Sequence, residues 1–139
     1  MTDPNELTPT DLVLPVFGGL RVLVVEADAD SAASHAAVLR LHGFDAHAAR
    51  TGAAALEAVA ADRPRVVVLD PELPDTDGCD LIRRLRSAPD PPAVVVVTGQ
   101  TAAAFRLAVT AAGAAACLLK PADPKKLVRV VGGLFDTGS

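Results

Sequence analysis

Short apolar runs alternate with longer amphipathic segments from Arg21 almost to the end of the chain. The apolar runs are rich in valine and apolar on both faces, which is typical of strands buried in a parallel sheet. We expect strands within residues 21–25, 44–50, 65–70, 93–99 and 115–120. The segments between them carry helical spacing and capping residues, and we expect helices within residues 30–43, 51–64, 79–88, 101–113 and 123–135.

Five strands alternating with five helices predict an α/β fold: a doubly wound parallel sheet with helices on both faces, joined by right-handed crossovers. Asp28 or Asp30 is a suitable N-cap for the first helix, and Thr51 for the second. In the first helix, Val38, Leu39 and Leu41 are the larger side chains expected to be buried.

The pattern also suggests how the chain is divided. Residues 1–19 mix prolines, acids and threonines without periodicity, and we expect a disordered or loosely docked N-terminal tail. A single domain is expected over residues 20–136, followed by a short C-terminal tail at 137–139. The sequence ends soon after the fifth predicted helix, so the domain either stands alone or is a piece of a longer protein.

Composition narrows the function classes. The 139 residues carry a net charge of −4 and no basic stripe, so no nucleic-acid partner is expected. Cys79 and Cys117 lie far apart and have no metal-ligand spacing, which favours two reduced thiols. There is neither a signal-peptide pattern nor an apolar run of about 18 residues, so we expect a cytoplasmic protein without a membrane partner.

Polar residues follow most of the predicted strands, and parallel strands present their carboxyl ends at one edge of the sheet. The residues expected there are Glu26, Asp28, Asp70, Thr98, Gly99 and Lys120. Clustered carboxylates favour a hard divalent cation, Mg²⁺ first, and a nearby ammonium and hydroxyl suit a phosphoryl group. Taken singly, a carboxylate or lysine at a strand end is more often a helix cap or a solvated loop residue. The whole set of residues in this order is harder to explain as a series of unrelated caps and loop residues.

The segment from about Leu20 to Phe135 resembles the receiver domain of two-component response regulators. The most specific part of the resemblance is Asp70 at the end of the third strand, followed by Pro74 and the pair Asp77-Gly78. VVVVTG and LLKP supply the other family positions, which are Thr98, Gly99, Lys120 and Pro121. The resemblance implies a flavodoxin-like fold with five parallel strands in the order 2-1-3-4-5.

The resemblance also implies a function. Asp70 would accept a phosphoryl group from a histidine kinase or histidine phosphotransfer protein, within a phosphorelay that signals through altered binding of a downstream protein. Mg²⁺ would be held by Glu26, Asp70 and the backbone carbonyl of Glu72, with Asp28 as a further candidate. Thr98, Gly99 and Lys120 would contact the phosphoryl oxygens. Such a domain is not an enzyme beyond its own phosphorylation and dephosphorylation.

Two positions depart from the family pattern. The second of the two acids expected after the first strand is Ala27, and Asp28 comes one residue later. Loss of a direct oxygen ligand should weaken Mg²⁺ binding. Three residues before Lys120, receivers commonly carry a tyrosine or phenylalanine that takes part in switching, whereas this chain has Cys117.

Two hypotheses follow. In the first, the chain is a phosphate-accepting signalling domain, which the joint presence of Asp70, Thr98 and Lys120 favours. In the second, it is a pseudo-receiver that only binds proteins, because Ala27 impairs the Mg²⁺ site. An aspartate-nucleophile hydrolase fits less well, since only Glu72 matches its expected second acid, and no glycine-rich loop supports nucleotide binding.

Overall fold

The computed structural model describes residues 20–137. The strands are β1 (Arg21–Val25), β2 (Asp45–Ala49), β3 (Val66–Leu69), β4 (Ala93–Thr98) and β5 (Ala116–Leu119). The helices are α3 (Ala29–Leu41), α4 (Gly52–Asp62), α5 (Gly78–Arg86), α6 (Ala103–Ala112) and α7 (Pro124–Thr137). The tail expected at 1–19 lies outside the described residues, as do residues 138–139, while Thr137 is the last residue of α7.

All neighbouring strands pair in parallel, in the order β2-β1-β3-β4-β5. This confirms the doubly wound sheet and the flavodoxin-like strand order. β1 lies inside the sheet, the chain then moves to one edge at β2, and it crosses β1 to build the other half. The strand order therefore reverses between β1 and β3, and in open α/β sheets ligands bind beside such a point.

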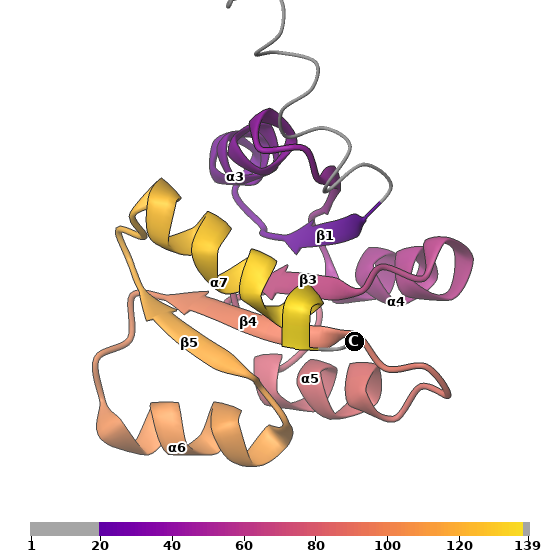
Figure 1. The fold of residues 1–139 in the computed structure, drawn as a ribbon. Helices are drawn as coiled ribbons and strands as arrows, with labels where there is room; N and C mark the ends of the chain where they lie inside the picture. Colours follow the sequence, from indigo (N-terminus) through magenta and orange to yellow (C-terminus); the bar gives the residue numbers. More distant parts are fainter. Residues whose placement is uncertain (1–19, 138–139) are drawn as a thin grey trace, which may run out of the picture.

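Helices cover both faces of the sheet (Figure 1). Alternate strand residues such as Val24, Val68 and Val97 face a core that α3 and α7 close with Leu39 and Leu127. The intervening strand residues face α4, α5 and α6, in a second core. This second core contains Val25, Val67, Val96, Ala55, Leu81, Ile82, Leu85 and Val109. Burial on both faces explains why the strands read as continuous apolar runs.

The helix starts follow the capping residues in the sequence. Asp28 accepts a hydrogen bond from the Ser31 N–H at 2.9 Å, and Thr51 accepts one from the Ala54 N–H at 3.0 Å. Asp77 likewise caps α5 through the Asp80 N–H at 3.1 Å. Each cap satisfies a backbone donor that the first helical turn leaves unpaired.

One expectation about the core of the first helix was wrong. Leu39 is fully buried and Val38 is half-buried, but the Leu41 residue is 78 % exposed. The buried positions of α3 are Ala32, Ala36 and Leu39, which recur at intervals of three and four residues. Leu41 lies two residues, or about 200°, beyond Leu39 and so faces away from the sheet.

Among the described residues, no helix is long and apolar enough to cross a lipid bilayer.

Candidate functional site

The backbone places three charged residues at the carboxyl edge of the sheet, each directly after a strand. Glu26 follows β1 and donates its N–H to the Ala49 carbonyl at 3.0 Å. Asp70 follows β3 and donates to the Val25 carbonyl at 2.9 Å, while Lys120 follows β5 and donates to the Thr98 carbonyl at 2.8 Å. The strand pairing thus continues one step beyond the strands and fixes where each side chain starts.

The three side chains meet. The Lys120 ammonium pairs with Oδ2 of Asp70 and lies 3.4 Å from Oε1 of Glu26. Glu26 is 4 % exposed and Asp70 is 9 % exposed, so both carboxyl groups are largely out of water. The sequence prediction that acids after the first and third strands converge with the lysine after the fifth agrees with this arrangement.

The second oxygen of Asp70 is also held, since Oδ1 accepts a hydrogen bond from the Glu72 N–H at 2.9 Å. Burial disfavours the charged form of Asp70, but the hydrogen bonds from Lys120 and Glu72 outweigh it and keep the pKa of Asp70 below its usual value. Asp70 is therefore an ionised carboxylate at neutral pH, with donors on both oxygens. An anion there can act as a nucleophile toward a group that the same donors bind.

Glu26 has the opposite electrostatic behaviour. Burial, together with the hydrogen bond and the negative charge of Asp70, raises the pKa of Glu26 to about 7. Burial also disfavours the charged form of Lys120, but the two carboxyl groups outweigh it and raise the Lys120 pKa. The single positive charge of Lys120 is shared between two neighbouring carboxyl groups, so one of them lacks a full counter-charge. A divalent cation bound to their oxygens would supply it.

The remaining candidate ligands fit this site less well. Asp28 is exposed, and its carboxylate caps α3 through the Ser31 N–H. The Ala27 carbonyl accepts a hydrogen bond from Nε of Arg50 at 3.1 Å. An isolated antiparallel bridge pairs Glu72 with Asp77 and orders the loop that carries the Glu72 carbonyl. Within residues 20–137, no three or more His, Cys, Asp or Glu side chains group as a metal site.

Thr98 and Gly99 lie at the end of β4, beside the site. Thr98 is 1 % exposed, and its hydroxyl oxygen accepts the Gln100 N–H at 3.0 Å. Gly99 is exposed, and a Cβ built on it would meet nothing within 4 Å. Lys120 is joined to Pro121 by a cis peptide bond.

Cys117 lies in β5 opposite Val96 and is half-buried against the second core. It lines a cavity of about 220 Å³ with Leu119, Pro121 and other residues of the β5–α7 region. No aromatic side chain occupies this position, so movement of an aromatic ring between two positions is not available here to carry a signal.

Sequence reasoning did not single out Asp75, which lies in the loop after Asp70. Its two carboxylate oxygens accept the N–H groups of Gly52 at 2.8 Å and Ala53 at 3.0 Å, at the start of α4. The signal was weak because these partners are 22 and 23 residues away, beyond any local capping pattern.

Comparison with known proteins agrees with this geometry. A family model for the response regulator receiver domain matches residues 22–132. The chain is 38 % identical over 115 residues to the transcriptional regulatory protein PrrA of Mycobacterium tuberculosis, a match that covers 83 % of this chain and 49 % of PrrA. It is 37 % identical over 102 residues to the response regulator MprA of Mycolicibacterium vanbaalenii, covering 73 % of this chain and 44 % of MprA.

Solved structures show the same fold. The Francisella response regulator 1452 receiver domain has a TM-score of 0.80 at 24 % identity, covering 86 % of this chain and 98 % of that one. A putative response regulator from Chloroflexus aurantiacus has a TM-score of 0.77 at 30 % identity, covering 82 % and 95 %. The chain spans about half the length of PrrA and MprA. From its matched residues and its fold, the chain belongs to the family of response regulator receiver domains.

Proposed function

We propose that this receiver domain accepts a phosphoryl group on Asp70 and signals by changing which protein it binds. The observation that carries the proposal is the placement of Asp70, which is buried, ionised, and held by Lys120 on one oxygen and by the Glu72 N–H on the other. Receiver domains in general interact with histidine kinases, and a histidine kinase or histidine phosphotransfer protein is the proposed donor.

In the proposed step, an oxygen of Asp70 attacks the phosphorus of a phosphohistidine. The phosphorus–nitrogen bond breaks, the imidazole leaves with the electron pair, and an acyl phosphate remains on Asp70. Lys120, the Glu72 N–H, the Gly99 N–H and the Thr98 hydroxyl are the groups proposed to bind the phosphoryl oxygens. Such positioned donors are most of what phosphoryl transfer requires of a protein.

Receiver domains generally bind Mg²⁺ at the phosphorylation site, and we propose Glu26, Asp70 and the Glu72 carbonyl as its protein ligands here. The buried acid pair, with the pKa of Glu26 raised to about 7, supports the fit because Lys120 supplies only one positive charge for two carboxyl groups. A bound Mg²⁺ would neutralise charge that builds up on the transferring group. With Ala27 in place of a second acid and Asp28 engaged with Ser31, we expect weaker binding than in receivers with a full ligand set.

A second candidate, a pseudo-receiver that binds proteins without being phosphorylated, is favoured by the same two residues. PrrA is named a transcriptional regulatory protein. For this chain, the absence of nucleic-acid contact, the cytoplasmic location and the lack of enzymatic turnover on other substrates stay predictions.

The test is intact-mass spectrometry after incubation with acetyl phosphate, with and without Mg²⁺. The proposal expects the wild-type chain and the control Asp28→Asn to gain one phosphoryl mass, and Asp70→Asn to gain none. Gain that disappears without Mg²⁺ would support a working metal site. If acetyl phosphate and a panel of phosphorylated histidine phosphotransfer proteins all give no gain, the pseudo-receiver reading replaces the proposal.

A further inference from the structure

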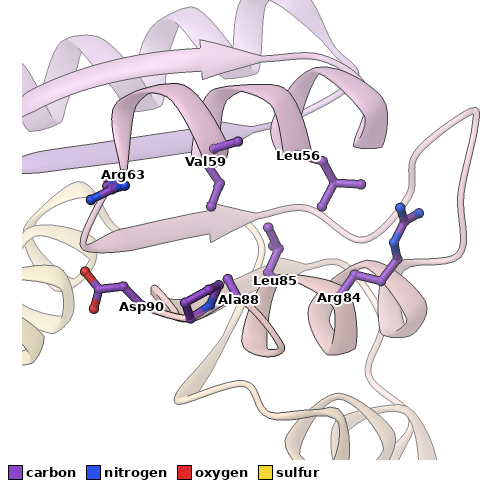
Figure 2. Close-up of a pocket in the computed structure, with 9 residues that line it drawn as sticks. Leu56, Val59, Arg63, Arg84, Leu85, Ala88 and Asp90 are labelled. Carbon is purple, nitrogen blue, oxygen red and sulfur yellow. The ribbon is translucent and has the colours of Figure 1, made fainter.

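A cavity of about 330 Å³ opens between α4 and α5, on the side of the sheet away from α3 and α7. Figure 2 shows α4 along one wall, with Leu56, Val59 and Arg63, and α5 with the following turn along the other, with Arg84, Leu85 and Ala88. We call this cavity the α4–α5 groove. Its volume lies at the lower end of the range of about 300–1,000 Å³ typical of ligand sites. None of the residues proposed for phosphorylation line it.

The groove is apolar along its floor and charged at its ends. Leu85 is fully buried at the base, while Leu56 and Val59 are half-buried along α4. Arg84 reaches from α5 toward Leu56 at one end, and Arg63 and Asp90 lie at the other (Figure 2). Within residues 20–137, neither guanidinium takes part in a hydrogen bond or ion pair that the structure records. Asp90 offsets the charge at the Arg63 end, which leaves the Arg84 end positive.

Arg63 also has an unfavourable backbone. It caps α4 in the left-handed region, with φ 50° and ψ 59°, and is the one residue other than glycine with positive φ in the described part of the chain. Glycine or asparagine adopts this conformation more readily. Strained positions concentrate where a side chain serves a function, which makes the Arg63 end of the groove a place to look for a partner.

The chain itself carries a segment that fits these properties. Residues 11–17 read DLVLPVF, an acid followed by an almost continuous apolar run. The first nineteen residues contain Asp3, Glu6 and Asp11 but no lysine or arginine. An acidic and apolar segment complements a groove with an apolar floor and an uncompensated arginine.

The point of attachment lies at the Arg63 end of α4, where Arg21 and Asp62 line a separate small hollow and not the groove itself. At the start of β1, Nη1 of Arg21 donates to the Asp62 carbonyl at 2.6 Å, and Asp62 immediately precedes Arg63 at the end of α4. Phe17 is four residues from Arg21 and can reach about 13 Å from it, and Asp11, ten residues away, about 33 Å. The groove from Arg63 to Leu56 follows seven residues of helix, or about 10 Å. The reach of Asp11 therefore exceeds the length of the groove, which leaves chain to pass the end of α4.

We propose that residues 11–17 of this chain dock in the α4–α5 groove of the same molecule. The apolar residues cover Leu56, Val59 and Leu85, with Phe17 toward Arg63 and Asp11 toward Arg84. The direction follows from the tether, because the segment enters from the α4 end nearest Arg21 and runs toward the positive end. Docking would cover an apolar surface that the helices leave open.

The test uses the full-length chain with Phe17→Trp. Because the sequence has no tryptophan or tyrosine, the introduced indole is the only strongly emitting group. We expect its emission to be blue-shifted in native buffer relative to the same chain in denaturant, at every protein concentration in a dilution series. Adding Arg84→Glu is expected to lower the ratio of docked to free segment about two- to fivefold, as for a partly exposed ion pair. Leu56→Gln is expected to lower the ratio of docked to free segment as well.

Arg83→Glu is the matched control, because Arg83 is the neighbouring residue but pairs with Asp80 outside the groove. It is expected to leave the emission unchanged, and circular dichroism checks that every variant is folded. Emission at the denatured wavelength in native buffer would overturn the proposal. A blue shift that is unchanged by Arg84→Glu and Leu56→Gln would also overturn it, because the segment would then dock on another surface. A blue shift that vanishes on dilution would overturn it as well, because the docking would then be between copies of the chain.

Discussion

Oδ1 of Asp75 accepts the Gly52 N–H at 2.8 Å, which fastens the loop after Asp70 to the first turn of α4. A helix N-terminus normally takes its cap from its own chain segment, as Thr51 does here. The additional cap from Asp75 means that the loop bearing the proposed phosphorylation site and α4 are held as one unit.

Replacing Asp75 with alanine should lower the melting temperature. The change removes the acceptor for two backbone N–H groups, on Gly52 and Ala53, and leaves the start of α4 with only the Thr51 cap. Thermal unfolding followed by circular dichroism measures the effect. Asp62→Ala, at the opposite end of α4, is the control and should not lower the melting temperature, since an acid at a helix C-terminus opposes the helix dipole and its removal is neutral or slightly stabilising. Equal melting temperatures for the two variants would contradict the capping role.

Gly78→Ala should destabilise the protein by about 1–3 kcal/mol, as overpacking does in a tight site. A Cβ at position 78 would lie 2.5 Å from Cβ of Pro71 and 2.9 Å from the Pro71 carbonyl oxygen, so the loop after Asp70 would have to shift. Urea unfolding measures the free energy of unfolding. Gly99→Ala is the control, because a Cβ there meets nothing within 4 Å. If Gly78→Ala unfolds at the wild-type urea midpoint, the close approach to Pro71 is not a constraint.

Much of the fold could be predicted because local signals agree with one another. Valine-rich runs, capping residues at Asp28 and Thr51, and alternation of strands and helices all indicate a parallel sheet, whose carboxyl edge then collects Glu26, Asp70 and Lys120. The convergence follows from topology alone, since parallel strands end at the same edge.

What could not be predicted depends on contacts between distant segments. Leu41 looks like a core residue by type, but the sheet lies on the side of α3 that carries Ala32, Ala36 and Leu39. The cap that Asp75 places on α4 spans 22 to 23 residues and has no local pattern. Asp28 was a candidate both for the helix cap and for the metal, and only the position of the Ser31 N–H shows that its carboxylate caps α3.

Ala27→Asp should strengthen Mg²⁺ binding by about tenfold or more, equivalent to ~1.4 kcal/mol. The variant adds a carboxylate directly after Glu26, where the resemblance to receivers calls for a second acid, and Mg²⁺ prefers carboxylate oxygen ligands. Isothermal titration calorimetry measures the dissociation constant. Asp28→Asn is the control and should leave Mg²⁺ affinity almost unchanged, because that carboxylate is engaged with Ser31. A larger loss of affinity in Asp28→Asn than gain in Ala27→Asp would place Asp28 among the ligands.

His35 should make stability depend on pH just below neutrality. Burial, and then the positive charge of Lys120, lowers the pKa of His35 from its ordinary value of 6.5, while Asp70 acts in the opposite direction. The folded state therefore binds a proton on His35 less readily than the unfolded state does. Stability on this account is fully present above about pH 6.5 and is lost as the pH falls from there through the lower folded pKa. Urea midpoints measured between pH 7.5 and 5 (roughly the range in which histidines titrate) should fall less steeply for His35→Gln than for wild type. His42→Gln, which changes an exposed ring, is the control.

Because other groups also titrate in this range, the decisive quantity is the difference in slope between His35→Gln and wild type. Parallel slopes for the two would show that the surroundings of His35 do not resist its protonation.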